Sequence, residues 1–271
     1  MHPLPCLDRP VPFAMAHRGF DPNGLENSMP AFEAAVGLGV DFLETDVQVT
    51  SDGVLLAFHD ARLDRVTDMP GRVGHLPWSR VRRALIGGVE PIPRLEEVLD
   101  AWPHVRVNVD LKVRGAVAPF VQAVRRTRSR DRVCVTSFSD RRRAAAVREL
   151  RRDGPIAWSP GIRSMIQVVA AVRGAGPAAV SRVLGDAACV QVPVQFGGRQ
   201  VIGARFVRSM QEAGLQVHVW TVDDPEQMRH LLAIGVDAIV TNRSDLAVRI
   251  LREPPRAPGD VAGGATGGSG G

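Results

Sequence analysis

Three apolar stretches in the first 60 residues deliver side chains that can do acid–base or metal chemistry. These side chains are His17 and Arg18 after the first stretch, Glu44 and Asp46 within the second, and His59 after the third. Apolar strands that carry polar groups at their carboxyl ends are typical of active sites on parallel α/β scaffolds. We therefore interpret residues 13–60 as the larger part of an active site.

Glu44 and Asp46 predict a metal site. They lie two residues apart in an apolar stretch that reads as a strand, so their side chains leave the same face. Two inward carboxylates repel each other and are costly to bury unless a cation neutralises them. Oxygen ligands suit a hard divalent ion, Mg2+ or Ca2+, with Mn2+ as a further candidate. The alternative is a structural ion pair with an arginine.

The segment VRVNVDLKV repeats this spacing with Asn108, Asp110 and Lys112. Asp110 is a candidate third carboxylate ligand. Lys112 is the only lysine in the chain, and every other cationic side chain is an arginine or a histidine. A lysine is a compact point charge and an arginine a planar fork, so the two are not interchangeable in a tight site. We predict that Lys112 neutralises the carboxylates or holds a phosphate oxygen, although chance survival is the alternative.

His17 and His59 are candidates for the acid and base of an in-line displacement at phosphorus. Arg18 can donate a charge-assisted hydrogen bond to the phosphate. Trp220 is predicted to form an apolar wall for the substrate, with a core tryptophan as the alternative. The remaining histidines are assigned structural roles: His2, His75, His104, His218 and His230.

The elements that would position these groups alternate between strand and helix, apart from one short further strand expected at 55–58. Expected strands cover 13–16, 42–49, 106–113, 133–138, 156–158, 189–194, 216–222 and 238–241. Expected helices cover 29–38, 94–101, 118–128, 140–151, 164–173, 204–213, 225–234 and 245–251. Such alternation implies a parallel sheet. Eight units in this length favour an α/β fold closed as a TIM (β/α)8 barrel over a doubly wound sheet.

The chain divides into one domain with two flanking segments. Residues 1–11 are proline-rich and predict an irregular lead-in, and residues 12–253 form the barrel domain. Within it, 61–93 is rich in turn signals and is expected to make a small excursion over the barrel mouth. Residues 254–271 are rich in glycine and proline and predict a disordered tail.

Composition narrows the possible partners and location. The chain has 271 residues and a net charge of +5, but its arginine clusters lack interleaved aromatic residues, which argues against nucleic-acid binding. Three cysteines without paired spacing favour a reducing compartment, and we expect a cytoplasmic protein. No apolar run approaches the length of a membrane span, so no stable membrane insertion is expected. Nothing in the sequence indicates the oligomeric state.

Several motifs together resemble the glycerophosphodiester phosphodiesterase family, in its compact bacterial cytosolic form. They are HRG at 17–19, EN at 26–27, ETDV at 44–47, HD at 59–60, VDLK at 109–112, VWTVDD at 219–224 and GVDAIVTN at 235–242. The resemblance covers about residues 13–250. It implies a TIM barrel of the phospholipase-C-like phosphodiesterase type. It also implies metal-dependent hydrolysis of glycerophosphodiesters to sn-glycerol 3-phosphate and an alcohol.

By the same resemblance, each candidate residue acquires a role. The metal-ligand positions of the family fall on Glu44, Asp46 and Asp110, and the acid/base pair falls on His17 and His59. The phosphate contacts fall on Arg18 and Lys112. The substrate wall falls on Trp220. Two positions depart from the family pattern. Asp110 stands where glutamate is usual, which leaves the preferred ion open, and Asn242 stands where aspartate often occurs.

Two other functions remain open at this point. One is a lipid phosphodiesterase of the lysophospholipase D or sphingomyelinase D type with the same metal site. The other is a non-catalytic phosphate-binding barrel. The sequence does not decide whether the nucleophile is water or the glycerol 2-hydroxyl of the substrate.

Overall fold

Eight parallel strands form the centre of the fold in a computed structural model that describes residues 4–174, 177–196 and 199–253. The strands are β1 (Phe13–His17), β2 (Phe42–Val49), β6 (Arg106–Leu111), β7 (Val133–Thr136), β8 (Ala157–Trp158), β9 (Cys189–Pro193), β12 (Gln216–Trp220) and β13 (Ala238–Thr241). Their order in the sheet is β8-β7-β6-β2-β1-β13-β12-β9. The backbone N–H of Ala188 donates to the carbonyl of Trp158 at 3.0 Å, so the two ends of the sheet meet. The predicted TIM barrel is confirmed.

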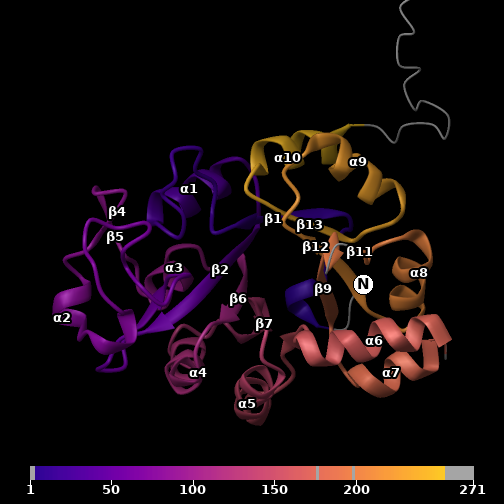
Figure 1. Ribbon diagram of the computed structural model, residues 1–271, viewed down its shortest axis with the longest axis horizontal. Helices are drawn as coiled ribbons and strands as arrows, with labels where there is room; N and C mark the ends of the chain where they lie inside the picture. Colours follow the sequence, from indigo (N-terminus) through magenta and orange to yellow (C-terminus); the bar gives the residue numbers. More distant parts are fainter. Residues whose placement is uncertain (1–3, 175–176, 197–198, 254–271) are drawn as a thin grey trace, which may run out of the picture.

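Helices surround the barrel on its outer face (Figure 1). They are α1 (Met29–Gly37), α3 (Leu95–Ala101), α4 (Val117–Arg126), α5 (Asp140–Leu150), α6 (Ile162–Gly174), α7 (Pro177–Leu184), α8 (Ala204–Glu212), α9 (Pro225–Ala233) and α10 (Ser244–Arg252). Local sequence sets several of their starts. The hydroxyl of Ser28 accepts from the N–H of Ala31, and the carboxylate of Asp224 accepts from the N–H of Gln227. These N-caps satisfy N–H groups that the first helical turn leaves free.

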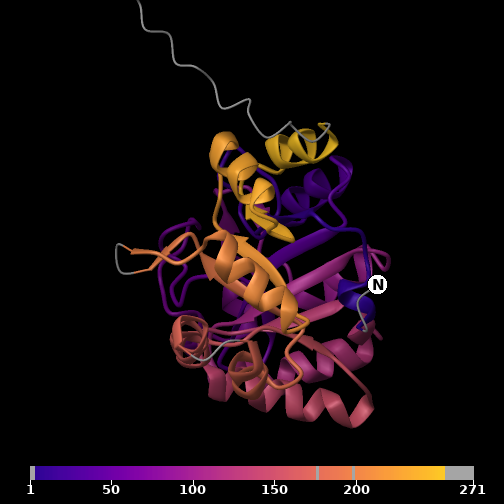
Figure 2. The ribbon, with the colours of Figure 1, turned by 90° about the vertical axis from the view of Figure 1, so that its right-hand side faces the viewer.

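Two elements differ from the expectation for residues 174–203. Helix α7 occupies a stretch for which no helix was expected, and Val180 and Leu184 are buried one helical turn apart. Proline is favoured in the first turn of a helix, so Pro177 starts α7 instead of breaking it. A hairpin of β10 (Gln195–Phe196) and β11 (Arg199–Gln200) follows β9 and projects from the barrel (Figure 2).

Residues 61–93 form the expected small excursion, and they pack on β3 beside β2. Their elements are η2 (Val73–His75), α2 (Trp78–Val81), β4 (Leu85–Ile86) and β5 (Glu90–Pro91), next to β3 (Leu55–Ala57), which pairs antiparallel with β2. They share a small apolar core with β3 that includes Leu56, Phe58, Leu63, Val81 and Ile86. This core holds the excursion against β2, where Figure 1 shows it at the left.

The lead-in contains an ordered turn, the 3-10 helix η1 (Pro5–Leu7). Cys6 and Leu7 are buried with Phe13 and Phe42, at the amino ends of β1 and β2. The lead-in thus closes the end of the barrel opposite the strand carboxyl ends. Other 3-10 turns are η3 (Arg114–Ala116), η4 (Arg130–Arg132) and η5 (Arg151–Asp153). The tail at 254–271 lies outside the described residues.

Within the described ranges, no helix is long and apolar enough to span a membrane.

Candidate active site

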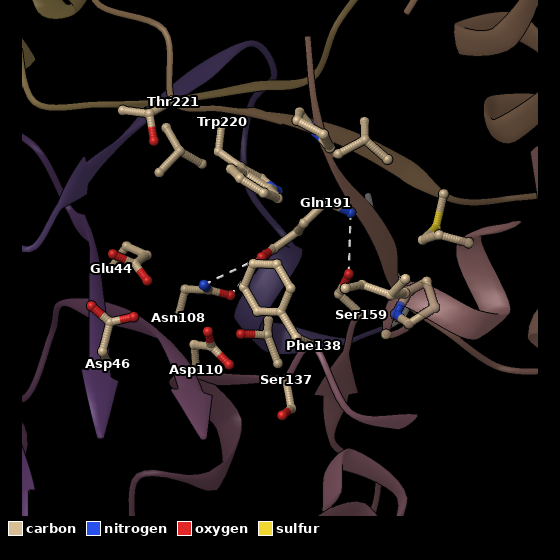
Figure 3. A pocket seen from close by; sticks show the side chains of 18 of the residues that line it. Glu44, Asp46, Asn108, Asp110, Ser137, Phe138, Ser159, Gln191, Trp220 and Thr221 are labelled. Carbon is tan, nitrogen blue, oxygen red and sulfur yellow. Dashed lines mark hydrogen bonds between the residues drawn. The ribbon is translucent and has the colours of Figure 1, made fainter. Parts of the chain in front are cut away.

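A cavity of about 700 Å³ opens at the carboxyl ends of the barrel strands (Figure 3). All eight residues singled out in the sequence line it: His17, Arg18, Glu44, Asp46, His59, Asp110, Lys112 and Trp220. No residue of the excursion at 61–93 lines it. The fold therefore gathers the predicted side chains from four strands and from the three segments that directly follow β1, β3 and β6 into one place.

The register of β2 and β6 sets the acidic side of the cavity. Asp46 pairs with Asp110 and Glu44 with Asn108 in the parallel ladder. Residues paired this way point to the same face of a sheet, here the barrel interior. All three carboxylates are buried, at 7%, 2% and 6% exposure for Glu44, Asp46 and Asp110. The predicted carboxylate group is thus on one face, as the i, i+2 spacing indicated.

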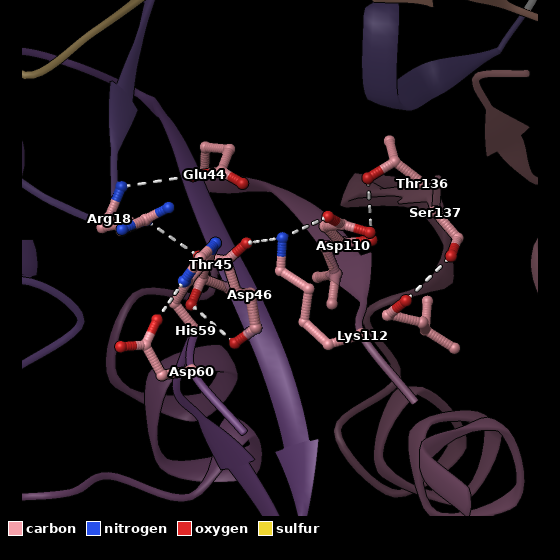
Figure 4. A network of polar contacts seen from close by, with 12 residues as sticks. Arg18, Glu44, Thr45, Asp46, His59, Asp60, Asp110, Lys112, Thr136 and Ser137 are labelled. Atoms are coloured by element: carbon pink, nitrogen blue, oxygen red, sulfur yellow. Dashed lines mark hydrogen bonds and ion pairs between the residues drawn. The ribbon is translucent and has the colours of Figure 1, made fainter. Parts of the chain in front are cut away.

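Lys112 neutralises two of these carboxylates (Figure 4). Its Nζ lies 2.7 Å from Oδ1 of Asp46 and 2.6 Å from Oδ2 of Asp110. Burial alone would lower the pKa of Lys112, but the two carboxylates outweigh it and raise this pKa. Burial would likewise raise the pKa of Asp46, yet Lys112 and Arg18 hold it below its ordinary value. The predicted role of Lys112 in neutralising charge agrees with this geometry.

Arg18 reaches its partners through an unusual backbone conformation. It has φ +60°, and the next residue, Gly19, has φ +87°. A Cβ on Gly19 would lie 2.7 Å from the carbonyl carbon of Ala31, so only glycine fits against α1. The turn directs Nε of Arg18 to within 2.9 Å of Asp46 and Nη1 to within 3.0 Å of Glu26. Arg18 and Lys112 both bind carboxylates here, at the edge of the space where a phosphate would enter.

Glu44 and Asp110 are the two carboxylates whose burial the nearby cations do not fully offset. Burial, with the negative charge of Asp46 adding to it, raises the pKa of Glu44. Burial also raises the pKa of Asp110 despite its contact with Lys112, and its buried Oδ1 accepts no hydrogen bond. Uncompensated carboxylate oxygens are what a hard divalent cation binds. The donor set therefore fits Mg2+ or Ca2+ chemically.

The same carboxylates are not arranged around a common point. Among residues 4–174, 177–196 and 199–253, no three His, Cys, Asp or Glu side chains gather as a metal site would require. The Lys112 ammonium instead lies between Asp46 and Asp110. A cation at these oxygens would compete with Lys112, so its binding requires this side chain to move.

His17 is oriented by a second pair of side chains. Its Nδ1 lies 2.7 Å from Oδ1 of Asn242, whose Nδ2 donates to Asp223 at 2.8 Å. Since the bond to Asp223 fixes which end of the amide faces His17, Nδ1 carries the proton. In the part of the chain that the structure describes, Nε2 accepts no hydrogen bond and lies 3.9 Å from Oε2 of Glu44. Burial, together with the nearby charge of Arg18, lowers the pKa of His17. The neutral ring can therefore accept a proton at Nε2. Asn242 replaces the expected aspartate and still orients the histidine.

His59 is oriented in a similar way by its neighbour. Its Nδ1 lies 2.5 Å from Oδ1 of Asp60. Arg65 donates to the same carboxylate and to Glu26, linking the excursion to the loop after β1. The hydrogen bond from Arg65 lowers the pKa of Asp60 to about 2, so this group stays ionised. With Nδ1 bonded to Asp60, Nε2 of His59 is also the free ring nitrogen.

The other side of the cavity is apolar and was largely missed from the sequence. Trp220 and Phe138 meet edge to face, with ring centroids 5.7 Å apart. Beyond them lie four residues of α6: Ile162, Met165, Ile166 and Val169. Residues 162–172 are apolar on more than one helix face. This pattern is the sequence feature that could have indicated the apolar side of the cavity. The helix was predicted, but its two apolar faces were not distinguished.

Two assignments are settled by burial. His218 is fully buried and contacts Gln191 and Gln216, which confirms its structural role. Trp158 is a core residue as well: it lies against the guanidinium of Arg143 and does not line the cavity.

The chain is similar in sequence and in fold to members of one enzyme family. Residues 17–246 match the glycerophosphoryl diester phosphodiesterase family. The chain is 42% identical to "Probable glycerophosphodiester phosphodiesterase 2" of Mycobacterium tuberculosis, over 88% of this chain and 90% of that protein. A glycerophosphodiester phosphodiesterase structure from Agrobacterium tumefaciens superposes with a TM-score of 0.72 at 24% identity, covering 88% of this chain and all of the other. An Oleispira antarctica phosphodiesterase, solved with the product sn-glycerol-3-phosphate, has a TM-score of 0.71 at 22% identity, covering 89% and 96%.

Proposed function

The chain belongs to the glycerophosphoryl diester phosphodiesterase family and is a phosphodiesterase, and on this premise we propose how its own residues carry out the hydrolysis. We propose metal-dependent cleavage of glycerophosphodiesters to sn-glycerol 3-phosphate and an alcohol, with His17 and His59 as the acid/base pair. One observation carries the proposal. Two oriented imidazoles, three buried carboxylates, Arg18 and Lys112 line a single cavity at the carboxyl ends of the strands.

The two histidines divide the proton transfers. One imidazole removes a proton from the attacking hydroxyl as its oxygen forms a bond to phosphorus. The other gives a proton to the leaving alcohol oxygen as the second P–O bond breaks. Each ring keeps Nδ1 bonded, His17 to Asn242 and His59 to Asp60, which leaves Nε2 for these transfers. The nucleophile would be water or the glycerol 2-hydroxyl of the substrate; the second route forms a cyclic phosphate that 31P NMR detects.

Arg18 and Lys112 would hold the phosphate. A phosphodiester carries one negative charge, and both cations face the cavity from the side of Asp46. Charge-assisted hydrogen bonds from such groups are the stronger class of phosphate contact. Trp220 would bound the substrate on the opposite side, where Figure 3 shows it across from Glu44 and Asp46.

Glu44, Asp46 and Asp110 would hold one divalent cation, Mg2+, Ca2+ or Mn2+. Bound there, the ion would polarise the phosphoryl oxygen and offset the charge that develops on it. Support comes from the raised pKa of Glu44 and of Asp110, whose burial disfavours their ionised forms until a cation is near. Lys112 would then turn from Asp110 towards the phosphate.

The test removes and restores the ion. We expect protein treated with EDTA to lose release of sn-glycerol 3-phosphate from glycerophosphocholine, and Mg2+, Mn2+ or Ca2+ to restore it to different extents. The same cations should raise the melting temperature of the wild type but not of Asp110→Asn, which reports binding without turnover. Full activity in EDTA would overturn the metal dependence while leaving the phosphodiesterase activity standing.

The non-catalytic alternative predicted that a histidine or a carboxylate of the site would be missing. All of them are present and line the cavity.

A further inference from the structure

Arg65, in the excursion at 61–93, binds two carboxylates, each of which contacts a residue of the site. Its Nε lies 2.6 Å from Oδ2 of Asp60, and its Nη2 lies 3.2 Å from Oδ1 of the same group. Its Nη1 and Nη2 donate to Oε2 and Oε1 of Glu26 at 3.0 and 2.6 Å. One guanidinium therefore holds both carboxylates through paired hydrogen bonds, which the point charge of a lysine cannot reproduce.

The two carboxylates connect Arg65 to residues that line the cavity. Asp60 lies 2.5 Å from Nδ1 of His59 (Figure 4), and Glu26 accepts from Nη1 of Arg18 at 3.0 Å. His59 and Arg18 line the cavity, whereas Arg65, Asp60 and Glu26 do not. Arg65 is thus the common partner behind one proposed proton-transfer group and one proposed phosphate contact.

Arg65 also helps to keep both carboxylates ionised. Burial would raise the pKa of Glu26, but the hydrogen bonds from Arg65 and the charge of Arg18 lower it. The hydrogen bond from Arg65 has the larger part in lowering the pKa of Asp60 to about 2. An ionised carboxylate can only accept hydrogen bonds, so Asp60 fixes the proton of His59 on Nδ1.

The backbone around Arg65 is fixed by the small apolar core of the excursion. Leu63 is fully buried in that core, and Val66 packs against it. The N–H and the hydroxyl of Thr67 both donate to the carbonyl of Leu63, at 3.1 and 2.9 Å. A turn that is held in one conformation lowers the entropy cost of the contacts its side chains make.

The contacts of Arg65 are not what holds the excursion on the barrel. The side chain of Arg65 is 48% exposed, and ion pairs at such exposure stabilise a fold only weakly. The excursion is held by the apolar core that it shares with β3. Without Arg65, Asp60 and Glu26 would repel each other and Asp60 could rotate away from His59. The main consequence of the contacts is therefore the orientation of these carboxylates.

We propose that Arg65 is a positioning residue for the hydrolysis: through Asp60 it orients His59, and through Glu26 it holds Arg18. The proposal rests on the proposed function, because it takes His59 to transfer a proton and Arg18 to bind the phosphate. The excursion at 61–93 thus takes part in building the site, although none of its residues lines the cavity.

A matched pair of variants tests the position. Arg65→Ala should lower kcat for glycerophosphocholine by about 10- to 100-fold, which is usual when a residue that orients an active-site group is removed. Arg62→Ala is the control in the same segment, because Arg62 is 52% exposed, pairs with Asp64 and does not line the cavity. It should keep the wild-type kcat. Circular dichroism and the melting temperature should be nearly the same for the two variants.

Added guanidinium separates positioning from a structural role. In Arg65→Ala, a planar guanidinium ion can enter from solvent and bind between Glu26 and Asp60. Millimolar guanidinium chloride should restore part of kcat in this variant, whereas sodium chloride at the same concentration should not. The wild type and Arg62→Ala should not respond. Guanidinium weakens folding, so it cannot restore a variant whose only fault is instability.

A second background shows through which groups Arg65 acts. Arg65→Ala should lower kcat little further in a protein that already carries Glu26→Gln and Asp60→Asn. The carboxylates through which Arg65 acts are then gone, and effects that share one path do not add.

Two results would overturn the inference and leave the proposed function standing. One is wild-type kcat in Arg65→Ala while His59→Ala is inactive. The other is a fall in kcat that guanidinium does not restore and that is equally large in the Glu26→Gln, Asp60→Asn background. Wild-type kcat in His59→Ala would instead contradict the proposed function. Restoration by guanidinium of Arg65→Ala alone would support the inference.

Discussion

The two sides of the cavity differ in how their side chains are held. On the side of β2 and β6, the ladder register and ion pairs fix each group, with Lys112 between Asp46 and Asp110. On the side of α6, aliphatic side chains face the cavity with no polar partner and substantial exposure. The first side has the fixed donors and acceptors that chemistry requires. The second has the non-directional surface that suits a variable substituent.

The two sides are built differently because a small displacement is more harmful to a catalytic group than to an apolar contact. Hydrogen bonds and proton transfers fail when atoms move by a fraction of an ångström, so catalytic groups gain from rigid strands. Hydrophobic contact depends on area and tolerates small shifts. We therefore expect substitutions on the charged side to act on kcat and those on the side of α6 to act mainly on KM.

The largest effect should come from the histidines. His17→Ala and His59→Ala each remove one proton-transfer group, and each should lower kcat by about 10²–10⁴-fold. Circular dichroism and the melting temperature should stay close to those of the wild type. Wild-type turnover in either variant would contradict the acid/base assignment and remove the contrast between the two sides.

Lys112→Met should lower both the stability of the fold and the activity. It leaves Asp46 and Asp110 buried without their common cation, and breaking a buried pair in this way costs about 3 kcal/mol. Activity should fall by about 10²-fold, since a phosphate contact is lost as well. Urea unfolding and steady-state kinetics measure the two effects. Lys112→Arg, which keeps the charge, should recover stability more fully than activity.

Asn242→Ala should have a smaller effect, because Asn242 acts on His17 by orienting it. We expect kcat to fall by about tenfold, with KM nearly unchanged. Asn242→Asp should recover part of the rate, since a carboxylate accepts the same hydrogen bond from Nδ1, but it loses the hydrogen bond to Asp223 and repels that carboxylate. It should also shift the pH profile upward, because a negative charge favours protonated His17. An identical pH profile for the wild type and Asn242→Asp would exclude the orienting contact.

The smallest effect should be on the stability of the fold in acid, through Asp60 at the rim of the charged side. The pKa of Asp60 is about 2 in the folded protein, below its ordinary value of 3.8. Asp60 therefore stabilises the fold above about pH 4, and this contribution is lost as the pH falls towards 2. Asp60→Asn should lower the melting temperature slightly at pH 6, and the difference from the wild type should shrink towards pH 3. A constant difference would show that ionisation of Asp60 does not contribute.

The charged side was predictable because its signals are local. Alternation places Glu44 with Asp46, and Asn108 with Asp110, on single strand faces, and the lone lysine draws attention to Lys112. The expected start of the first helix at residue 29 agrees with α1, whose N-cap is Ser28. The barrel itself follows from eight strand–helix units of similar length.

The partners of these residues depended on contacts between distant segments. Arg65 meets Glu26 and Asp60, and Asn242 meets His17, across separations that no periodicity in the sequence encodes. The position of residues 61–93 beside β2 was decided by the apolar core they share with β3. Turn signals show where such a segment bends and carry no information on what it packs against.

The sequence by itself determined the strand–helix order, the faces of the strands and the set of reactive side chains, because these depend on neighbours within a few residues. Only the tertiary structure decided that Lys112 lies between two carboxylates, that Asn242 orients His17, and that one apolar face of α6 is left open to the cavity. Closing the barrel brings residues more than a hundred positions apart into contact. Which of two apolar helix faces is buried depends on the surface it packs against, which lies elsewhere in the chain.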